Sequence, residues 1–327
     1  MSATKFAAKT LALLMAVILT MLGLMRLIPP AISISEADYL SATNQKHALL
    51  AKTASPKIVL VGGSGLALGV DSEKIQNNLN RPVVNMGLYA GLGLRVMLDE
   101  VRPYIRAGDV IYITPEYQLY YRETRRSDDA IATLVQVSFP QSMAYLPATT
   151  HLHALTAIWN AEQKALGNAI TRKTPPQPAT SPQVEYFREG FNAHGDYVAH
   201  LGKPGLGADK INALKLSYQE NLTFDPDSIA ALNDFADFAK SRGATAILAF
   251  PVIPEQLYTN DAGNRALLDA LYQTIQRDAK MTITGSPPKS LLPASDFYDT
   301  IYHLNDSGRA KYTAQIVAAL RVLPNAP

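Results

Sequence analysis

The chain has 327 residues, with 30 basic and 28 acidic side chains and no cysteine. A chain of this length can form one large α/β domain or two ordinary domains, because domains usually contain about 100–200 residues. The near balance of charge argues against a nucleic-acid partner, and the absence of cysteine excludes disulfides, thiolate metal sites and a cysteine nucleophile.

An apolar segment lies close to the N-terminus. Thr10–Met25 contains no charged residue, Lys5 and Lys9 precede it, and Arg26 follows it. The segment is shorter than the ~20 residues of a typical spanning helix, but the Arg26 side chain can extend toward the lipid headgroups. Because lysines ahead of such a segment favour the cytoplasmic side, we predict a single-pass signal anchor over residues 1–33. A cleaved signal peptide and a soluble helix are the alternatives.

The next part of the sequence alternates between strand and helix patterns, after a helical connector at 34–56. Short apolar runs that end in glycine or polar residues predict buried strands at 57–61, 81–87, 109–114 and 244–251. Amphipathic patterns predict helices at 71–79, 94–105, 227–241, 262–278 and 307–320. This alternation predicts a three-layer α/β/α sandwich, in which helices cover both faces of a mainly parallel sheet.

The alternation stops between about 119 and 222. This part has helical patterns at 130–137 and 152–166, followed by a proline-rich stretch at 173–182 that does not favour regular structure. We therefore predict one α/β domain over 57–327, interrupted by an insertion of helices and loops.

Small and polar residues follow the predicted strands, at the edge where open parallel sheets bind ligands. Ser64 lies in a glycine-rich turn after the first strand, and Gly87 follows the second strand. Asp299 and His303 lie just before the last predicted helix. A serine nucleophile needs a base, and the base needs an acceptor that orients it, so Ser64, His303 and Asp299 are candidates for these roles.

Three segments carry a resemblance to a known family. VLVGGSGLALGVDS, VVNMGLYAGLGL and FYDTIYHLNDSGRAKYT resemble the first, second and last conserved blocks of the SGNH/GDSL hydrolase superfamily. The resemblance covers 57–118 and 225–320, and it is greatest to bacterial membrane-anchored members associated with exopolysaccharide and cell-wall O-acylation. It implies a flavodoxin-like sheet of the SGNH-hydrolase type.

The resemblance also implies roles for individual residues. Ser64 would be the nucleophile, His303 its base and Asp299 the partner of the base. The N–H groups of Ser64 and Gly87 would bind the oxyanion. The aspartate usually lies three residues before the histidine, whereas Asp299 lies four before His303, so Asp296 is the other carboxylate candidate.

The third block of the superfamily normally ends in Gly-x-Asn, and its amide helps to hold the oxyanion. Here the strand runs into Glu116 and Tyr117, so that amide is missing. The segment GFNAHGD resembles an element of some polysaccharide-associated relatives, and its Asn192 is our candidate replacement. We expect Glu116 and Tyr117 to contact the substrate. The alternatives are a structural salt bridge for Glu116 and packing under the insertion for Tyr117.

These features predict a membrane-anchored SGNH-type enzyme that forms an acyl-Ser64 intermediate. We expect O-acetyl transfer to, or removal from, a bacterial polysaccharide or another acylated carbohydrate, by a domain on the periplasmic side of the inner membrane. No cofactor or metal is expected, and His194, Asp196 and His200 match no standard metal-site spacing. The alternative is a non-catalytic accessory protein that binds polysaccharide or a membrane-bound O-acyltransferase.

Overall fold

The computed structural model describes residues 5–6, 9–10, 12–13, 15–16, 38–138, 140–147, 150–151, 156, 159, 186–216 and 222–322. Most of the predicted anchor, the proline-rich stretch and most of the predicted helix at 152–166 lie outside these residues. Within the described ranges, no helix is both long enough and apolar enough to cross a membrane.

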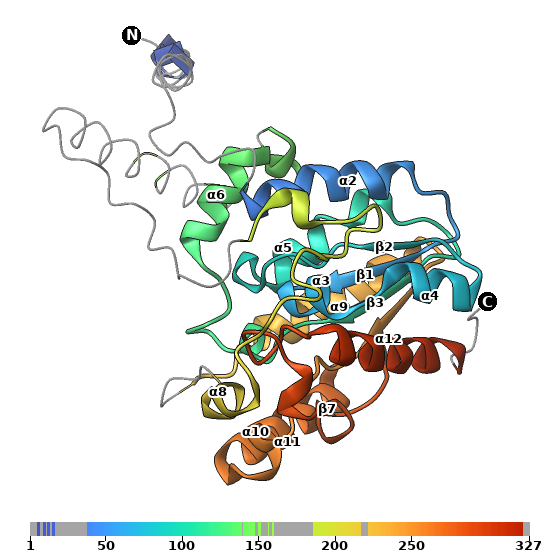
Figure 1. Ribbon diagram of the computed structural model, residues 1–327. Helices are drawn as coiled ribbons and strands as arrows, with labels where there is room; N and C mark the ends of the chain where they lie inside the picture. The colour runs from blue at the N-terminus through green and yellow to red at the C-terminus, as the bar shows by residue number, and fades with distance from the viewer. Residues whose placement is uncertain are drawn as a thin grey trace, which may run out of the picture.

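Five parallel strands form the central sheet, in the order β2–β1–β3–β4–β6 (Figure 1). Their bounds are β1 Ile58–Gly62, β2 Val83–Asn85, β3 Val110–Thr114, β4 Thr245–Leu248 and β6 Thr282–Ile283. A separate parallel pair is formed by β5 Ile253–Pro254 and β7 Leu291–Leu292. The sequence does not predict β5, β6 or β7, because two residues are too few to show an apolar pattern.

Alternate residues of the strands build two cores, one on each face of the sheet. In β1, Val59 and Val61 belong to one core and Leu60 to the other. The first core includes residues of α2 Ala42–Lys52, α5 Leu94–Asp99, α6 Asp128–Ser138, α9 Pro226–Ser241 and α11 Ala262–Asp278. The second includes residues of α4 Ser72–Leu79, α8 Ala208–Ala213 and α12 Asp306–Arg321.

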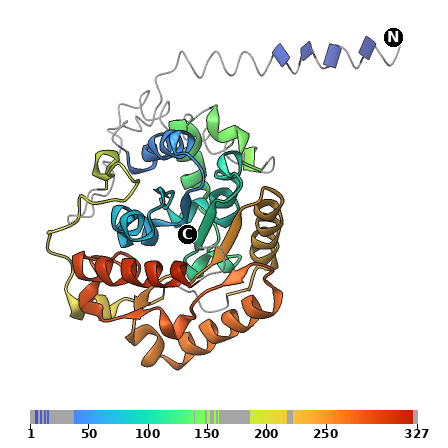
Figure 2. The same ribbon diagram turned by 90° about the vertical axis from the view of Figure 1, so that its right-hand side faces the viewer.

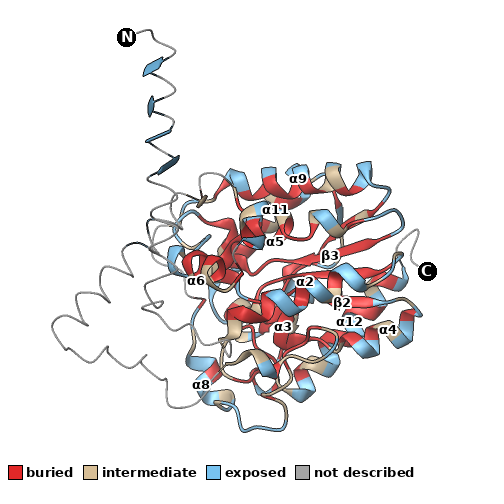
Figure 3. Ribbon diagram, turned by 90° about the horizontal axis from the view of Figure 1, so that it is seen from above, coloured by how far each residue is buried: buried red, intermediate tan, exposed pale blue. Residues whose placement is uncertain are grey.

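The predicted arrangement of a mainly parallel sheet flanked by helices is confirmed. The strands are buried, and the flanking helices are exposed on their outer sides (Figure 3). On one face α12 lies alongside α4 (Figures 1 and 2). The predicted start of α4 is also confirmed, because the Asp71 side chain caps this helix by accepting a hydrogen bond from Lys74 N–H.

The helix predicted at 94–105 is shorter than expected. α5 ends at Asp99, and Arg102–Tyr104 forms a separate 3₁₀ turn. Pro103 has no N–H and disfavours the helical conformation of the residue before it, so a continuous helix is interrupted there.

The described part of the insertion packs against the carboxyl ends of β1 and β2. Tyr197 N–H donates to Ala67 O in α3 (Ser64–Gly69), the helix that follows β1. Asn85 N–H, at the end of β2, donates to His194 O. These bonds place the insertion beside the turn that carries Ser64.

Candidate active site

The turn at Ser64 is held by a buried carboxylate. Glu116 lies just after β3, is only 1% exposed, and accepts the N–H groups of Gly63 and Gly65, each at 3.0 Å. A Cβ at Gly63 would collide with this carboxylate, so glycine is required for the close approach. Glu116 therefore fixes the backbone on both sides of Ser64.

Ser64, His303 and Asp299 form a continuous chain of hydrogen bonds. His303 Nε2 lies 2.8 Å from Ser64 Oγ, and His303 Nδ1 lies 2.8 Å from Asp299 Oδ1. With a proton on Nδ1, the imidazole donates to Asp299 and accepts from the serine hydroxyl. The structure therefore brings together the three residues that the sequence proposes.

The loop before α12 explains the four-residue spacing between Asp299 and His303. Thr300 Oγ1 accepts the N–H groups of Tyr302 and His303, which turns the chain back toward Asp299. Asp296 is buried and pairs with Lys311 at 2.7 Å. Asp299, and not Asp296, is the carboxylate at His303.

Tyr186 is a site residue that the sequence analysis does not identify. Its hydroxyl donates to Asp299 Oδ2 at 2.5 Å and lies 3.0 Å from His303 Nδ1. Nothing distinguishes it from the other 15 of the 16 tyrosines except its position just before the GFNAHGD element. It reaches the site from the insertion, 117 residues away from His303 in the chain.

The surroundings keep Asp299 ionised. Burial raises the pKa of Asp299, but the hydrogen bond and charge of His303, together with the Tyr186 hydroxyl, outweigh it and lower the pKa below its ordinary value. Burial and the charge of Asp299 raise the pKa of Tyr186, so this phenol remains a donor. An ionised acceptor behind His303 is the arrangement that stabilises an imidazolium.

The predicted oxyanion donors lie in different environments. Ser64 is the first residue of α3, so its N–H has no intrahelical acceptor. Gly87 N–H, in contrast, donates to Asn85 Oδ1 at 2.8 Å. The N–H of Gly87 is thus bonded to the side chain of Asn85, the last residue of β2, and is not the free donor that the oxyanion role requires.

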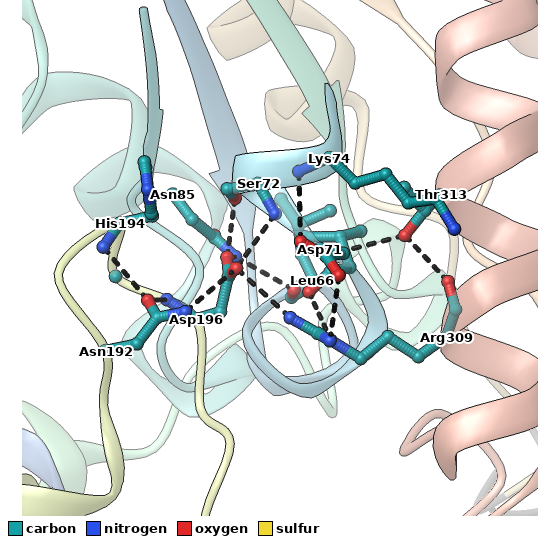
Figure 4. Close-up of polar contacts among 12 residues, drawn as sticks. Leu66, Asp71, Ser72, Lys74, Asn85, Asn192, His194, Asp196, Arg309 and Thr313 are labelled. Carbon is teal, nitrogen blue, oxygen red and sulfur yellow. Dashed lines mark hydrogen bonds and ion pairs between the residues drawn. The ribbon is translucent and has the colours of Figure 1, made fainter. Parts of the chain in front are cut away.

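Asn192 does not replace the missing amide. Its Oδ1 accepts the N–H groups of His194 and Asp196, and its Nδ2 lies 3.4 Å from Asp196 Oδ2 (Figure 4). Both ends of the side chain thus bond within its own loop, which corrects the expectation that Asn192 helps to hold the oxyanion.

The two residues expected to contact substrate are instead buried. Glu116 bonds to the backbone of the turn, and Tyr117 is fully buried in the core on the α5 side of the sheet. Burial raises the pKa of Glu116, and the N–H groups of Gly65 and Gly63 offset part of that effect. The described residues give Glu116 no basic partner, so the alternative salt bridge is not formed, and both of its carboxylate oxygens are used by the backbone of the serine turn.

Ser64 and His303 open onto a cavity of about 530 Å³. Its walls include the rings of Tyr39, Tyr89 and Tyr186. A cavity of this volume admits a small-molecule ligand or one or two sugar rings. The reactive hydroxyl is therefore accessible to a substrate.

A second polar cluster lies where the insertion meets α4 and α12 (Figure 4), and we call it the Asp196 cluster. Asp196 is fully buried and accepts Ser72 N–H at 2.8 Å, Ser72 Oγ at 2.5 Å and Asn85 Nδ2 at 2.9 Å. Arg309 Nη2 lies 3.4 Å from Asp196 Oδ2. Through Asn85 the cluster also fixes the acceptor of Gly87 N–H.

His194, Asp196 and His200, the residues of the insertion with a superficial likeness to metal ligands, have structural surroundings. Within the described residues, no group of three or more His, Asp or Glu is arranged to hold a metal ion. His200 Nε2 donates to Leu304 O at 2.9 Å, and burial lowers the pKa of this imidazole to about 4. His200 therefore supports, in its neutral form, the loop that carries His303.

Comparison of the chain with protein-family models gives no match, and comparison with curated proteins gives none either. The geometry of the site is therefore what indicates the chemistry of this protein.

Proposed function

We propose that this protein is an SGNH-type serine enzyme that transfers or hydrolyses O-acyl groups of a carbohydrate. The observation that carries the proposal is the chain from Ser64 through His303 to Asp299, open to a cavity at its serine end. The sheet order also supports it, since 2-1-3-4-5 along the sheet is the order of flavodoxin-like folds.

The geometry supports a two-step reaction. Ser64 Oγ attacks the acyl carbonyl carbon while His303 Nε2 accepts its proton, and Asp299 stabilises the imidazolium that forms. The N–H of Ser64 faces the developing negative charge. The proton then passes from His303 to the leaving alkoxide, and an ester of Ser64 remains.

The second step decides between the two activities. Water that attacks the acyl-serine releases the free acid, whereas a sugar hydroxyl that attacks it yields a new ester. In both cases His303 accepts the proton of the attacking group and returns it to Ser64 Oγ. The apolar N-terminal segment supports action at the periplasmic side of a bacterial inner membrane.

Labelling with a fluorophosphonate tests the proposal. This reagent should modify Ser64 in the full chain, as located by peptide mass spectrometry, and block the hydrolysis of 4-nitrophenyl acetate. Ser64→Ala should lose both signals. Ser72→Ala is the matched control, because Ser72 also bonds to a buried partner but does not line the cavity, and Ser64 should still be labelled.

A non-catalytic accessory role is the second candidate. It is favoured by Gly87 N–H, which bonds to Asn85, and by Asn192, which bonds within its own loop and does not replace the amide missing at Glu116. An oxyanion site with a single donor would lose about 3 kcal/mol of transition-state stabilisation. Absence of labelling at Ser64, combined with binding of polysaccharide or of a membrane acyltransferase, would establish this role instead.

A further inference from the structure

Among the described residues, the fixed charges that line the cavity at Ser64 are negative. Its charged side chains, apart from the titratable His303, are Asp38 and Asp129, and among the described residues no lysine or arginine lines it. Carboxylates in a partly enclosed site repel an anion and attract donors of hydrogen bonds. The described lining of the cavity therefore disfavours an anionic ligand relative to a neutral or cationic one.

Two arginines that precede Ser127 and Asp129 in the chain are directed away from the cavity. Arg125 pairs with Asp225, and Arg126 pairs with Asp128 at 3.0 Å. Both arginines line a different cavity, between α5 and α9, and not the one at Ser64. Their charge is largely balanced by these acids, so they do not reverse the sign at the site.

Several polar groups of the cavity have no partner within the described chain. The Asp129 carboxylate makes no hydrogen bond or ion pair, and only one oxygen of Asp38 is used, as the acceptor of Leu40 N–H at 2.8 Å. The Tyr89 hydroxyl is also unpartnered, and the residue is 42% exposed. These acceptors suit the hydroxyl or ammonium groups of a ligand.

The rings of the cavity present flat apolar surfaces between these acceptors. Tyr89 packs against Gly91, where a side chain would collide with the ring, and so one face of the ring is supported. Tyr39 and Tyr186 meet edge to face, with 5.7 Å between their centroids. Aromatic rings next to acceptor oxygens are suited to the alternating apolar faces and hydroxyl edges of a sugar.

We propose that the carbohydrate admitted to this cavity carries no carboxylate, sulfate or phosphate group, and is a neutral sugar or an amino sugar. Its ring stacks on Tyr89, and its hydroxyl or ammonium groups donate to Asp38 and Asp129. This inference rests on the proposed function for the identity of the site, but it concerns which sugars bind and not what Ser64 does to them.

Calorimetric binding to the full-length Ser64→Ala protein in detergent micelles tests the inference without requiring catalysis. The probes are cellohexaose, which is neutral, the hexamer of glucosamine, which is cationic, and hexagalacturonate, which is anionic. We expect the neutral and cationic hexamers to bind at least about tenfold more tightly than the anionic one, with a smaller difference at high salt. Equal or tighter binding of hexagalacturonate, or no binding of any hexamer, would overturn the inference.

Charge-neutralising variants test whether Asp38 and Asp129 cause the discrimination against the anionic hexamer. Asp38→Asn/Asp129→Asn, made in the same background, should reduce the discrimination against hexagalacturonate to within about threefold, and the amide oxygen introduced at position 38 can still accept Leu40 N–H. Glu73→Gln/Asp209→Asn removes the same charge from exposed positions outside the cavity and should leave the discrimination unchanged. An unaltered preference in the first variant would contradict the assignment of Asp38 and Asp129.

The two proposals fail in different ways. If the anionic hexamer binds best but the wild-type protein is labelled at Ser64, only the sugar class is wrong. If the expected charge preference is found but Ser64 is never labelled, the binding site stands and the enzymatic proposal fails.

Discussion

Two polar clusters share the insertion segment 186–196, and each contains a serine hydroxyl bonded to a titratable side chain. In the catalytic cluster, Ser64 bonds to His303 and faces a cavity. In the Asp196 cluster, Ser72 bonds to a carboxylate that is completely buried and that also has donors from β2 and α12.

The difference between the clusters lies in access and in unused hydrogen-bonding capacity. The oxygens of Asp196 are met by Ser72, Asn85 and Arg309, so nothing remains for a ligand. Ser64 has a base on one side and open space on the other. Similar residue types therefore stabilise the fold in one place and are available for chemistry in the other.

The largest expected effect is on catalysis. His303→Ala removes the proton acceptor of Ser64, and 4-nitrophenyl acetate hydrolysis should fall at least about 10³-fold, or about 4 kcal/mol in activation free energy. The thermal midpoint should change little, because the cluster is open. Activity close to that of the wild type would mean that Ser64 and His303 do not form a catalytic pair.

The next largest effect is on stability. Asp196→Ala removes the buried acceptor shared by Ser72, Asn85 and Arg309, and the free energy of unfolding should fall by about 3 kcal/mol in denaturant titrations. Ser72→Ala removes one of these bonds and should cost about 1 kcal/mol. A stable Asp196→Ala protein that no longer reacts at Ser64 would place Asp196 in the catalytic cluster, and the two clusters would then share one function.

Lys46, which lies beside the Asp196 cluster, should make the stability of the protein depend on pH. It is buried, and its Nζ donates to Asn85 O at 2.9 Å and to Gly195 O at 2.5 Å. Burial lowers the pKa of Lys46 from 10.5 to about 7, so between these values the unfolded chain binds a proton that the folded protein does not. The contribution of Lys46 to the free energy of unfolding should therefore rise with pH across this window, by up to about 1.4 kcal/mol per pH unit.

Lys46→Met tests this dependence. Denaturant titrations between pH 7 and about 8.5 stay below the range in which unfolded tyrosines ionise. The rise should be present in the wild type and missing in the variant, whatever the absolute stability of the variant. Parallel curves for the two proteins would show that Lys46 stays charged in the folded state.

The smallest expected effect concerns the support of Asp299. Tyr186→Phe removes one hydrogen bond to its carboxylate, and kcat/KM should fall about fivefold to tenfold, with less than about 1 kcal/mol lost in stability. The acid limb of the pH–rate profile should move to higher pH, because this hydroxyl lowers the pKa of Asp299. Tyr258→Phe is the control, since its hydroxyl donates to Asp269 at 2.7 Å outside the site, and it should leave both readouts unchanged.

The sequence predicts much of the fold because its signals are local. The apolar run at β1 and the N-cap at Asp71 give the correct elements, whereas Pro103 ends α5 earlier than the apolar pattern suggests. The two-residue strand β6 has no pattern of its own, and its place at the sheet edge depends on β4.

The candidate site likewise contains residues that the sequence predicts and hydrogen-bond partners that it does not. Ser64, Asp299 and His303 can be proposed because each lies in a distinctive short segment after a predicted strand or before a predicted helix. The hydrogen-bond partners of Gly87 and Asn192 cannot be predicted in this way. Gly87 N–H donates to Asn85 and Asn192 accepts from His194, so neither bonds toward Ser64.

The parallel α/β framework and the three residues proposed for the reaction follow from local sequence signals, because apolar periodicity and turn chemistry act over a few residues. Three other features depend on the folded chain: Tyr186 supports Asp299, Glu116 holds the serine turn, and Asp196 is fully buried. These outcomes depend on burial and on contacts between segments from 51 to 124 residues apart. At such separations, a polar side chain takes the partner that the packing brings within hydrogen-bond distance.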